Sequence, residues 1–367
     1  MKKILSFFLP AMAMLLIACN SNPSSENNDS SKSDDVSKLK GSTLNILCWE
    51  GYADPAFTKG FEEKYGVTVK GTYFGSGDEL ISKLQNGGGD VYDIISPSSD
   101  MAGYIAQNGM AAPVDVKKLS QWDSLSSKLR NMSDVMKDGQ YYGMPFTWGP
   151  DYLIYDADVV KTAPSSWKIF EDPQYKGKVS LWDDISNIYL IGQMQGLDKT
   201  DPSALYNMTD AQLAAAKTEL IKMKPQIRKY WATAGELDNM FKNKEVVLAV
   251  GWPLTISNLN KEGRNLKAVI PAEGATGWID RLMITSGSKN KELAMLYLDY
   301  ISQPENMAKV LEVTYYNVAN PGSSRYLSPD LQKISDASQF FDKLNFWQMV
   351  KDRKKYNEVW NEVKGAQ

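Results

Sequence analysis

The chain has 367 residues, more than one ordinary core holds and typical of two domains. Its formal net charge is only −3, which gives no indication of a nucleic-acid partner. The sequence contains no histidine and only two cysteines, which excludes histidine-based catalysis, histidine metal ligands and a zinc site of cysteines alone. We therefore expect neither a metal nor another cofactor.

The N-terminal segment has the pattern of an export signal. Residues 1–3 (MKK) are basic, and residues 4–17 form an apolar stretch too short to span a membrane as a mature helix. The segment ends in LIAC at 16–19, which resembles the lipobox of bacterial lipoproteins. The resemblance implies a signal peptide over 1–18 and acylation of Cys19, and an ordinary signal peptide with a chance cysteine is the alternative.

The segment that follows is polar. Residues 19–42 are rich in Ser, Asn, Asp and Lys, which cannot bury enough apolar surface to offset the entropy of ordering. We expect a flexible tether here, with folded sequence from about Thr43. No later apolar run is long enough to span a bilayer.

The folded body opens with alternating strands and helices. We expect strands at 44–48, 67–73 and 93–95. The first helix begins with Asp54 as its N-cap, and the second begins with a capping box, SGDE at 76–79. This βαβαβ order predicts an α/β fold with a mostly parallel sheet and helices on both faces.

The second half of the chain repeats this style. Residues 178–182 and 246–250 have the pattern of buried strands. Helices are expected after a Thr209–Gln212 cap, over 293–300 and over 356–363. The sequence shows no internal repeat.

Aromatic and acidic side chains recur at the ends of these strands. Ligands of open α/β sheets bind outside the carboxyl ends of the strands. The residues there are Trp49, Glu50, Tyr52, Ser98, Ser99, Asp100, Asp183, Asp184, Asn187 and Trp252, while Trp278 and Asp280 precede another apolar run at 282–284. Ring faces attract ammonium groups by about 0.5–2 kcal/mol each, and carboxylates neutralise them. The recurrence favours a site for a small aliphatic amine.

Each of these residues also has a structural explanation. A single Trp at a strand end often serves packing, paired aspartates often cap a helix, and serines occupy turns. An enzyme is disfavoured, because the adjacent carboxylates at 183 and 184 diverge, GGG at 87–89 lacks the ending of a phosphate loop, and no nucleophile elbow is present. We expect a protein that is not an enzyme.

The series of motifs along the body resembles the spermidine/putrescine-binding proteins of ABC importers. The likeness covers nearly the whole mature chain in the same order. The motifs are WEGY at 49–52, YGV at 65–67, YDI at 92–94, PS at 97–98, YGMP at 142–145 with Trp148, YKGK at 175–178 and GWID at 277–280.

This resemblance implies a two-lobed fold of the type II periplasmic-binding-protein class, with a mixed, mostly parallel sheet flanked by helices in each discontinuous lobe. Lobe 1 would hold 43–147 plus 279–324, and lobe 2 would hold 148–278 plus 325–367. The ligand would lie in the cleft between the lobes, and their closure would present the receptor to a permease.

The resemblance also implies ligand contacts, carried over one residue at a time. They are the aromatic walls Trp49, Tyr52, Trp252 and Trp278, the carboxylates Asp184 and Asp280, and the further contacts Ser98, Tyr316 and Gln348. Position in the sequence adds Glu50, Ser99, Asp100 and Asn187 to the predicted set.

Three positions depart from the family pattern. Gly51 stands where the family usually has an acid, Asn187 stands where a spermidine-type site has an acid, and Asp100 replaces a common aromatic residue. Since a buried cation without a partner costs several kcal/mol, these departures weaken the indication of a triamine.

The sequence therefore predicts an exported, monomeric solute-binding lipoprotein of an ABC importer, with putrescine or spermidine as ligand. It would be anchored at the outer face of the cytoplasmic membrane or in the periplasm, with no other membrane contact. Another small cationic or zwitterionic amine, such as GABA, betaine or a thiamine-like cation, is the alternative. Arg281 would then pair with a ligand carboxylate, unless it is a solvated surface or interlobe residue. An extracellular lipoprotein enzyme or adhesin is a remote alternative.

Overall fold

The computed structural model describes residues 38–336 and 340–366. The predicted signal peptide, Cys19 and most of the predicted tether lie outside the described residues. No described helix is long and apolar enough to cross a membrane. Leu39–Gln367 form one compact unit.

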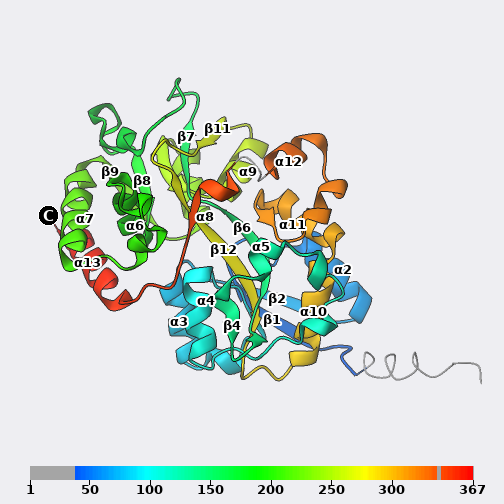
Figure 1. Ribbon diagram of the computed structural model, residues 1–367. Coiled ribbons are helices and arrows are strands. Elements are labelled where there is room, and N and C mark those ends of the chain that lie inside the picture. Colours follow the sequence, from blue (N-terminus) through cyan, green and yellow to red (C-terminus); the bar gives the residue numbers. More distant parts are fainter. Residues whose placement is uncertain (1–37, 337–339, 367) are drawn as a thin grey trace, which may run out of the picture. The chain divides into compact units, whose positions relative to one another are not determined.

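Two main β-sheets organise the described part of this unit (Figure 1). The seven-stranded sheet has the order β13-β6-β12-β3-β1-β2, with β14 paired to β12. Its strands are β1 (Thr43–Cys48), β2 (Thr68–Tyr73), β3 (Ile94–Ile95), β6 (Met144–Pro150), β12 (Ala275–Ile284), β13 (Asn317–Val318) and β14 (Leu344–Phe346).

The five-stranded sheet has the order β11-β7-β10-β8-β9. Its strands are β7 (Tyr152–Asp156), β8 (Val179–Trp182), β9 (Ile227–Trp231), β10 (Leu248–Gly251) and β11 (Leu266–Val269). A separate hairpin pairs β4 (Met136–Lys137) with β5 (Gln140–Tyr141).

Both sheets are mixed. In the first sheet β1 is parallel to its neighbours β2 and β3, and in the second β8 is parallel to β9 and β10. The βαβ pattern predicted the parallel arrangement of β1, β2 and β3, and strands were also expected near β8 and β10, whereas β9 was not predicted. Of the other neighbours, β14 is parallel to β12, whereas β12 runs antiparallel to β3 and β6, β13 to β6, and β7 to β10 and β11.

The helices begin and end largely where their caps predict. Asp54 accepts a hydrogen bond from the Ala56 amide at the start of α2, and Gly66 ends α2 in the left-handed conformation. The helices of the described residues are α2 (Pro55–Tyr65), α3 (Gly77–Gln85), α4 (Ser99–Gln107), α5 (Ser127–Arg130), α6 (Ser186–Met194), α7 (Asp210–Met223), α8 (Ala234–Lys242), α9 (Pro253–Lys261), α10 (Lys291–Ser302), α11 (Pro304–Thr314), α12 (Pro329–Ile334) and α13 (Arg353–Gly365).

The two predicted capping boxes differ. At the start of α7 the Thr209 side chain and the Gln212 side chain each bond to the other's backbone, as predicted. At the start of α3 the Ser76 side chain accepts from the Glu79 amide, but Glu79 reaches back to the Gly75 amide. Only half of the second box therefore has the predicted form.

Strand β12 differs from the sequence prediction. The sequence indicated only an apolar run at 282–284 with GWID before it, whereas the structure has one ten-residue strand from Ala275 to Ile284, buried throughout. A run that is buried on both faces shows no alternation, which hides its true start. β12 pairs with β6 along most of its length, with an irregularity in register between Asp280 and Arg281.

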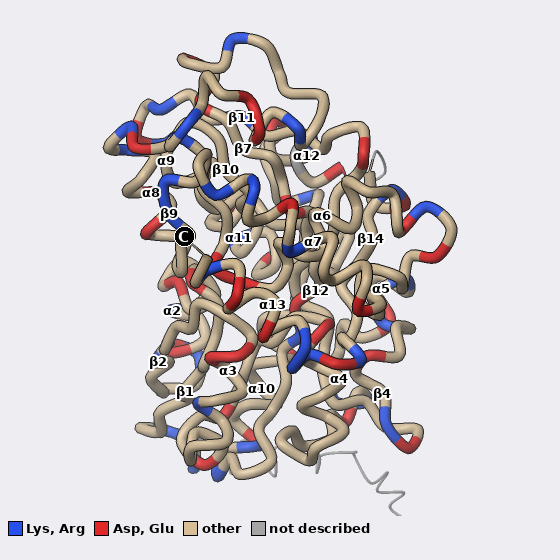
Figure 2. The backbone as a smooth tube through the Cα atoms, turned by 90° about the vertical axis from the view of Figure 1, so that its left-hand side faces the viewer, with Lys and Arg blue, Asp and Glu red and all other residues tan. Residues whose placement is uncertain are grey.

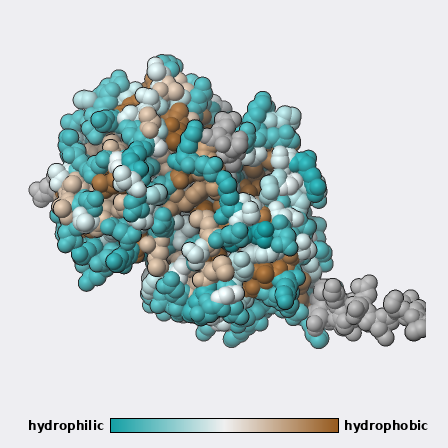
Figure 3. Space-filling view, in the orientation of Figure 1, coloured by the Kyte–Doolittle hydropathy of each residue, from teal (hydrophilic) through white to brown (hydrophobic). Residues whose placement is uncertain are grey.

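Apolar side chains of the two sheets join in one continuous core cluster. Much of the face seen in Figure 3 is hydrophilic, and apolar side chains gather near its middle. The functional residues predicted from sequence come from segments that adjoin this core.

Candidate functional site

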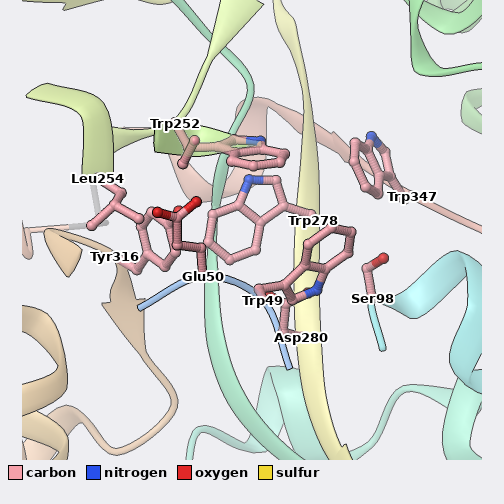
Figure 4. A pocket seen from close by; sticks show the side chains of 10 residues that line it. Trp49, Glu50, Ser98, Trp252, Leu254, Trp278, Asp280, Tyr316 and Trp347 are labelled. Carbon is pink, nitrogen blue, oxygen red and sulfur yellow. The ribbon is translucent and has the colours of Figure 1, made fainter. Parts of the chain in front are cut away.

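A pocket lies where segments of both sheets meet (Figure 4). The space that a water-sized molecule can occupy is about 20 Å³, room for about one water, because the aromatic rings lie close together. The lining combines aromatic rings with two carboxylates and consists of Trp49, Glu50, Ser98, Ala234, Trp252, Leu254, Trp278, Asp280, Tyr316 and Trp347.

Three lining residues follow structural elements, and for Trp49 and Trp252 the place at a strand end was expected from the sequence. Trp49 follows β1, and Trp252 follows β10 and is the N-cap residue of α9. Tyr316 follows Tyr315, which is the C-cap of α11 and has the left-handed conformation (φ 58°). A non-glycine residue in that region is uncommon. This turn sets the direction in which Tyr316 leaves the helix.

Trp278 and Asp280 reach the pocket in another way. Both lie inside β12, two residues apart, and side chains at that spacing point to the same face of a strand. Both side chains line the pocket. They precede the apolar run at 282–284, as expected, and belong to the same strand as that run, and their spacing in the GWID motif gives the shared direction.

The aromatic walls support one another. Trp49 packs against Phe74 with ring centroids 4.3 Å apart, and its ring is 5.9 Å from those of both Trp182 and Trp252. Trp278 meets Tyr316 edge to face at 4.7 Å. Such contacts fix ring orientation, so the walls are held in place by the protein, and Trp49 serves both the pocket and the core.

Asp280 is the buried carboxylate of the pocket and is only 4% exposed. The Tyr52 hydroxyl donates a hydrogen bond to it and is also hydrogen-bonded to Thr147. Burial raises the pKa of Asp280 to about 8, against the opposing effect of the Tyr52 hydrogen bond. No described Lys or Arg forms an ion pair with Asp280. Tyr52 therefore acts through Asp280 and does not itself line the pocket.

Glu50 is the second carboxylate of the pocket lining and is partly exposed. Its Oε2 accepts a hydrogen bond from the Gly235 amide in the first turn of α8, at 3.1 Å. Gly51 follows with φ +91°, a conformation that an aspartate or glutamate would adopt only with strain. The loop therefore places its acid at position 50.

Asp151 holds one wall of the pocket and was missed by the sequence analysis. It accepts hydrogen bonds from Thr276 Oγ1 at 2.5 Å and from Trp252 Nε1 at 3.3 Å. Burial raises its pKa to about 7. Asp151 directly follows β6, and this position could have marked it as a candidate, since position after a strand identified the other candidate residues.

Asp184 and Asn187 shape the turn before α6. Asp184 accepts a hydrogen bond from the Ser186 amide at 2.8 Å, and burial raises its pKa to about 7. Asn187 Nδ2 donates to the carbonyls of Trp182 and Asp184 at 2.6 and 2.8 Å. Neither side chain lines the pocket.

Ser99 and Asp100 lie behind the pocket lining. Ser99 Oγ donates to the Trp347 carbonyl at 2.8 Å, which fastens the segment that carries Trp347. Ser98 Oγ, which faces the pocket, donates to Asp100 Oδ1 at 2.9 Å. Asp100 Oδ2 in turn accepts from Arg353 Nη1 at 2.9 Å. These two residues position the lining.

Gln348 and Arg281 are not brought to the pocket. Gln348 is exposed and lines a neighbouring hollow, while the adjacent Trp347 faces the pocket and stacks on Trp182 at 5.9 Å. Arg281 is fully buried and donates to both oxygens of Asp134 at 2.7 and 2.8 Å and to the Leu129 carbonyl at 2.9 Å. It is neither a solvated arginine nor available to a ligand carboxylate.

The lining contains three residues that the sequence did not predict. Trp347 is adjacent to the predicted Gln348, which does not line the pocket. Ala234 and Leu254 are small or apolar residues that carry no chemical signal of ligand contact.

Known proteins resemble the chain over most of its length. The model of the bacterial extracellular solute-binding protein family matches residues 56–339. The spermidine/putrescine-binding periplasmic protein of Escherichia coli is 27% identical over 79% of this chain and 81% of that protein. The putrescine-binding periplasmic protein of the same organism gives the same three values.

A solved structure resembles the fold. It is a protein of Listeria monocytogenes, provisionally described as a spermidine/putrescine ABC transporter, with a TM-score of 0.78 and 25% identity over 89% of this chain and 99% of that chain. The two mixed sheets are accordingly those of the two-lobed periplasmic binding proteins. Since the family model matches more than half of its residues, the chain belongs to the bacterial extracellular solute-binding proteins.

Proposed function

We propose that the protein is the solute receptor of an ABC importer and binds a small aliphatic polyamine, putrescine or spermidine, in the pocket lined by Trp49, Trp278 and Asp280. The proposal rests on the burial of Asp280 and on its lack of an ion pair with a described Lys or Arg. This carboxylate lies beside aromatic faces. An ammonium group supplies the missing positive charge.

The lining offers one partner for each part of such a ligand. One ammonium would pair with Asp280, and Glu50 would receive the other. The methylene chain would lie against the indole walls, whose faces also attract the ammonium ends by about 0.5–2 kcal/mol each. The names of the Escherichia coli relatives support this ligand class.

The remaining features of the receptor are proposed with it. The chain would be exported, anchored through acylated Cys19 at the outer face of the cytoplasmic membrane or in the periplasm, and active as a monomer. Residues 43–147 plus 279–324 would form one lobe and residues 148–278 plus 325–367 the other. Closure of the lobes on the ligand would present the loaded receptor to the permease, and the ligand would not be changed chemically.

A zwitterionic amine such as GABA is the second candidate, on one observation. Trp278 Nε1 is a buried pocket donor without a hydrogen-bond acceptor among the described residues. A polyamine carries only donors when charged, whereas a ligand carboxylate would accept this hydrogen bond. Arg281 does not support these ligands, because its guanidinium is already hydrogen-bonded to Asp134.

Thermal unfolding against a ligand panel tests the proposal. The panel contains putrescine, cadaverine, spermidine, GABA, betaine, choline and thiamine. A ligand at 100 times its dissociation constant stabilises the folded state by about 2.7 kcal/mol, which gives a clear increase in Tm. An increase with putrescine or spermidine supports the proposal. An increase only with GABA or betaine contradicts it and favours the second candidate.

A further inference from the structure

An arginine outside the pocket lining occupies the acidic end of the site. Arg353 begins α13, and its guanidinium donates to Asp78 Oδ1 at 2.8 Å and to Asp100 Oδ2 at 2.9 Å. Asp78 belongs to α3 and Asp100 to α4. Figure 2 shows α13 beside these two helices, where acidic and basic stretches of the chain meet.

Two hydrogen bonds, through Asp100, connect this arginine with the pocket residue Ser98. Ser98 lines the pocket and donates to Asp100 Oδ1, while Arg353 binds the other oxygen of the same carboxylate. The Arg353 side chain is only 19% exposed. Its positive charge therefore lies directly behind the Ser98 end of the pocket.

We propose that Arg353 is a specificity-determining residue, a built-in cation that neutralises the acidic end of the site and restricts the ligand to two ammonium groups. The inference rests on the proposed function and narrows it to a diamine such as putrescine. A triamine would extend its third ammonium past Ser98, toward Asp100, where Arg353 already supplies the positive charge.

The distribution of charge in the site supports this restriction. The pocket lining presents Glu50 and Asp280, neither of which has an ion pair with a described Lys or Arg, and these two carboxylates match two ammonium groups. Beyond Ser98, whose backbone is bridged to that of Asp280, Asp78 and Asp100 are both paired with Arg353. A third ammonium there would meet a like charge and no unpaired carboxylate of this pair, which is unfavourable in a partly buried site.

The electrostatics of Arg353 agree with a fixed cation. Burial lowers the pKa of its guanidinium, but the charges of Asp100 and Asp78 reverse that effect and raise the pKa overall. Arg353 also opposes the effect of burial on the pKa of Asp184. Arg353 thus keeps its charge at every pH at which the receptor would work.

Calorimetric titration of the purified protein with putrescine and with spermidine tests the inference. We expect putrescine to bind at least tenfold more tightly than spermidine. In R353M, which keeps an aliphatic side chain and removes the charge, the ratio of the two dissociation constants should shift at least tenfold toward spermidine. The neighbouring K354M is the matched control, because Lys354 is 86% exposed and its only described ion pair is with Glu358, so its ratio should stay that of the wild type.

The outcomes separate this inference from the proposed function. Equal binding of both ligands by the wild type, or tighter binding of spermidine, overturns the inference and leaves the receptor proposal intact. A wild-type preference for putrescine that R353M keeps unchanged overturns the role of Arg353. Binding of neither amine refutes the proposed function itself. The wild-type ratio needs no variant, and R353Q replaces R353M if the latter does not fold.

Discussion

Asp280 and Asp100 are two buried aspartates near one pocket, and they differ in what neutralises them. Asp280 is 4% exposed and Asp100 is 6% exposed, so burial does not distinguish them. Asp100 receives a guanidinium hydrogen bond from Arg353, whereas Asp280 receives only the Tyr52 hydroxyl among its described side-chain partners. Among the described residues, the protein provides a cation to Asp100 and none to Asp280.

This difference indicates where the positive charge of the ligand would lie. A buried carboxylate that lacks a cation is costly unless it takes up a proton or a ligand supplies the charge. Asp280 is such a carboxylate, and its position beside Trp49 and Trp278 in the pocket lining gives the ligand a defined place. Variants and changes of pH test this difference between Asp280 and Asp100, beginning with the variant that should lower ligand affinity most.

Replacing Asp280 by Asn should have the largest effect. The variant keeps the shape of the side chain but removes the charge that pairs with the ammonium group. Losing one partner of a buried charge pair costs about 2–5 kcal/mol, so putrescine affinity should fall at least about 30-fold. Titration calorimetry measures this loss. Affinity within threefold of the wild type would place the ammonium group elsewhere.

Trp49→Ala should come next, but it should affect folding as well. Trp49 packs against Phe74 and Trp182, so its removal should cost about 3–5 kcal/mol of the free energy of unfolding. Trp122 is the matched control, since it has the same 8% exposure and does not line the pocket. Both variants should lose stability in denaturant unfolding, and only Trp49→Ala should also lose at least tenfold in ligand affinity. Equal affinity in the two variants would make Trp49 a core residue only.

The pH dependence of stability should also reveal the uncompensated carboxylates. Burial raises the pKa of Asp151 and Asp184 to about 7 and that of Asp280 to about 8. The folded state then holds more protons than the unfolded state between about pH 4 and pH 8, so the free energy of unfolding falls as pH rises through this window. We expect a loss of at least about 1.4 kcal/mol for the ligand-free protein, the free energy of a single one-unit shift.

Urea unfolding at pH 5 and pH 8 measures that loss. Asp280→Asn is the control, because it removes one titrating group and should reduce the dependence on pH. Stability that stays level or rises toward pH 8 in the wild type would contradict the raised pKa values.

Asp134→Asn should have the smallest effect on ligand affinity. It leaves the buried Arg281 guanidinium without its carboxylate, which should cost about 3–5 kcal/mol of stability. Because Arg281 points away from the pocket, putrescine affinity below the unfolding transition should stay within threefold of the wild type. Thermal unfolding and titration calorimetry check the two parts. A large loss of affinity would reconnect Arg281 with the ligand.

The sequence predicted β1, β2, β3, β8 and β10, because hydrophobic runs and helix caps are local signals, and it missed the parallel edge strand β9. Asp54, Gly66 and the Thr209 box lie at helix ends as expected. The start of β12 was missed, because a strand buried on both faces loses the alternation that marks a strand. Its pairing with β6 depends on residues more than a hundred positions apart, which no local pattern records.

The site was predicted in part for the same reason. Residues next to strand ends, such as Trp49 and Ser98, could be found from position and side-chain chemistry. Whether a carboxylate faces the ligand or another part of the chain depends on tertiary contacts. Asp184 and Asp280 look alike in the sequence, yet one accepts a local amide hydrogen bond and the other lines the pocket. The pairing of Arg353 with Asp78 and Asp100 is equally invisible without the fold.

The most direct test of the account is the number of protons released when putrescine binds near pH 7. Titration calorimetry in two buffers with different ionisation enthalpies gives this number. If an ammonium group pairs with Asp280, whose pKa lies at about 8 in the ligand-free protein, the carboxyl must lose its proton, and a substantial fraction of one proton should be released. Binding without proton release would contradict the pairing of the ligand with Asp280.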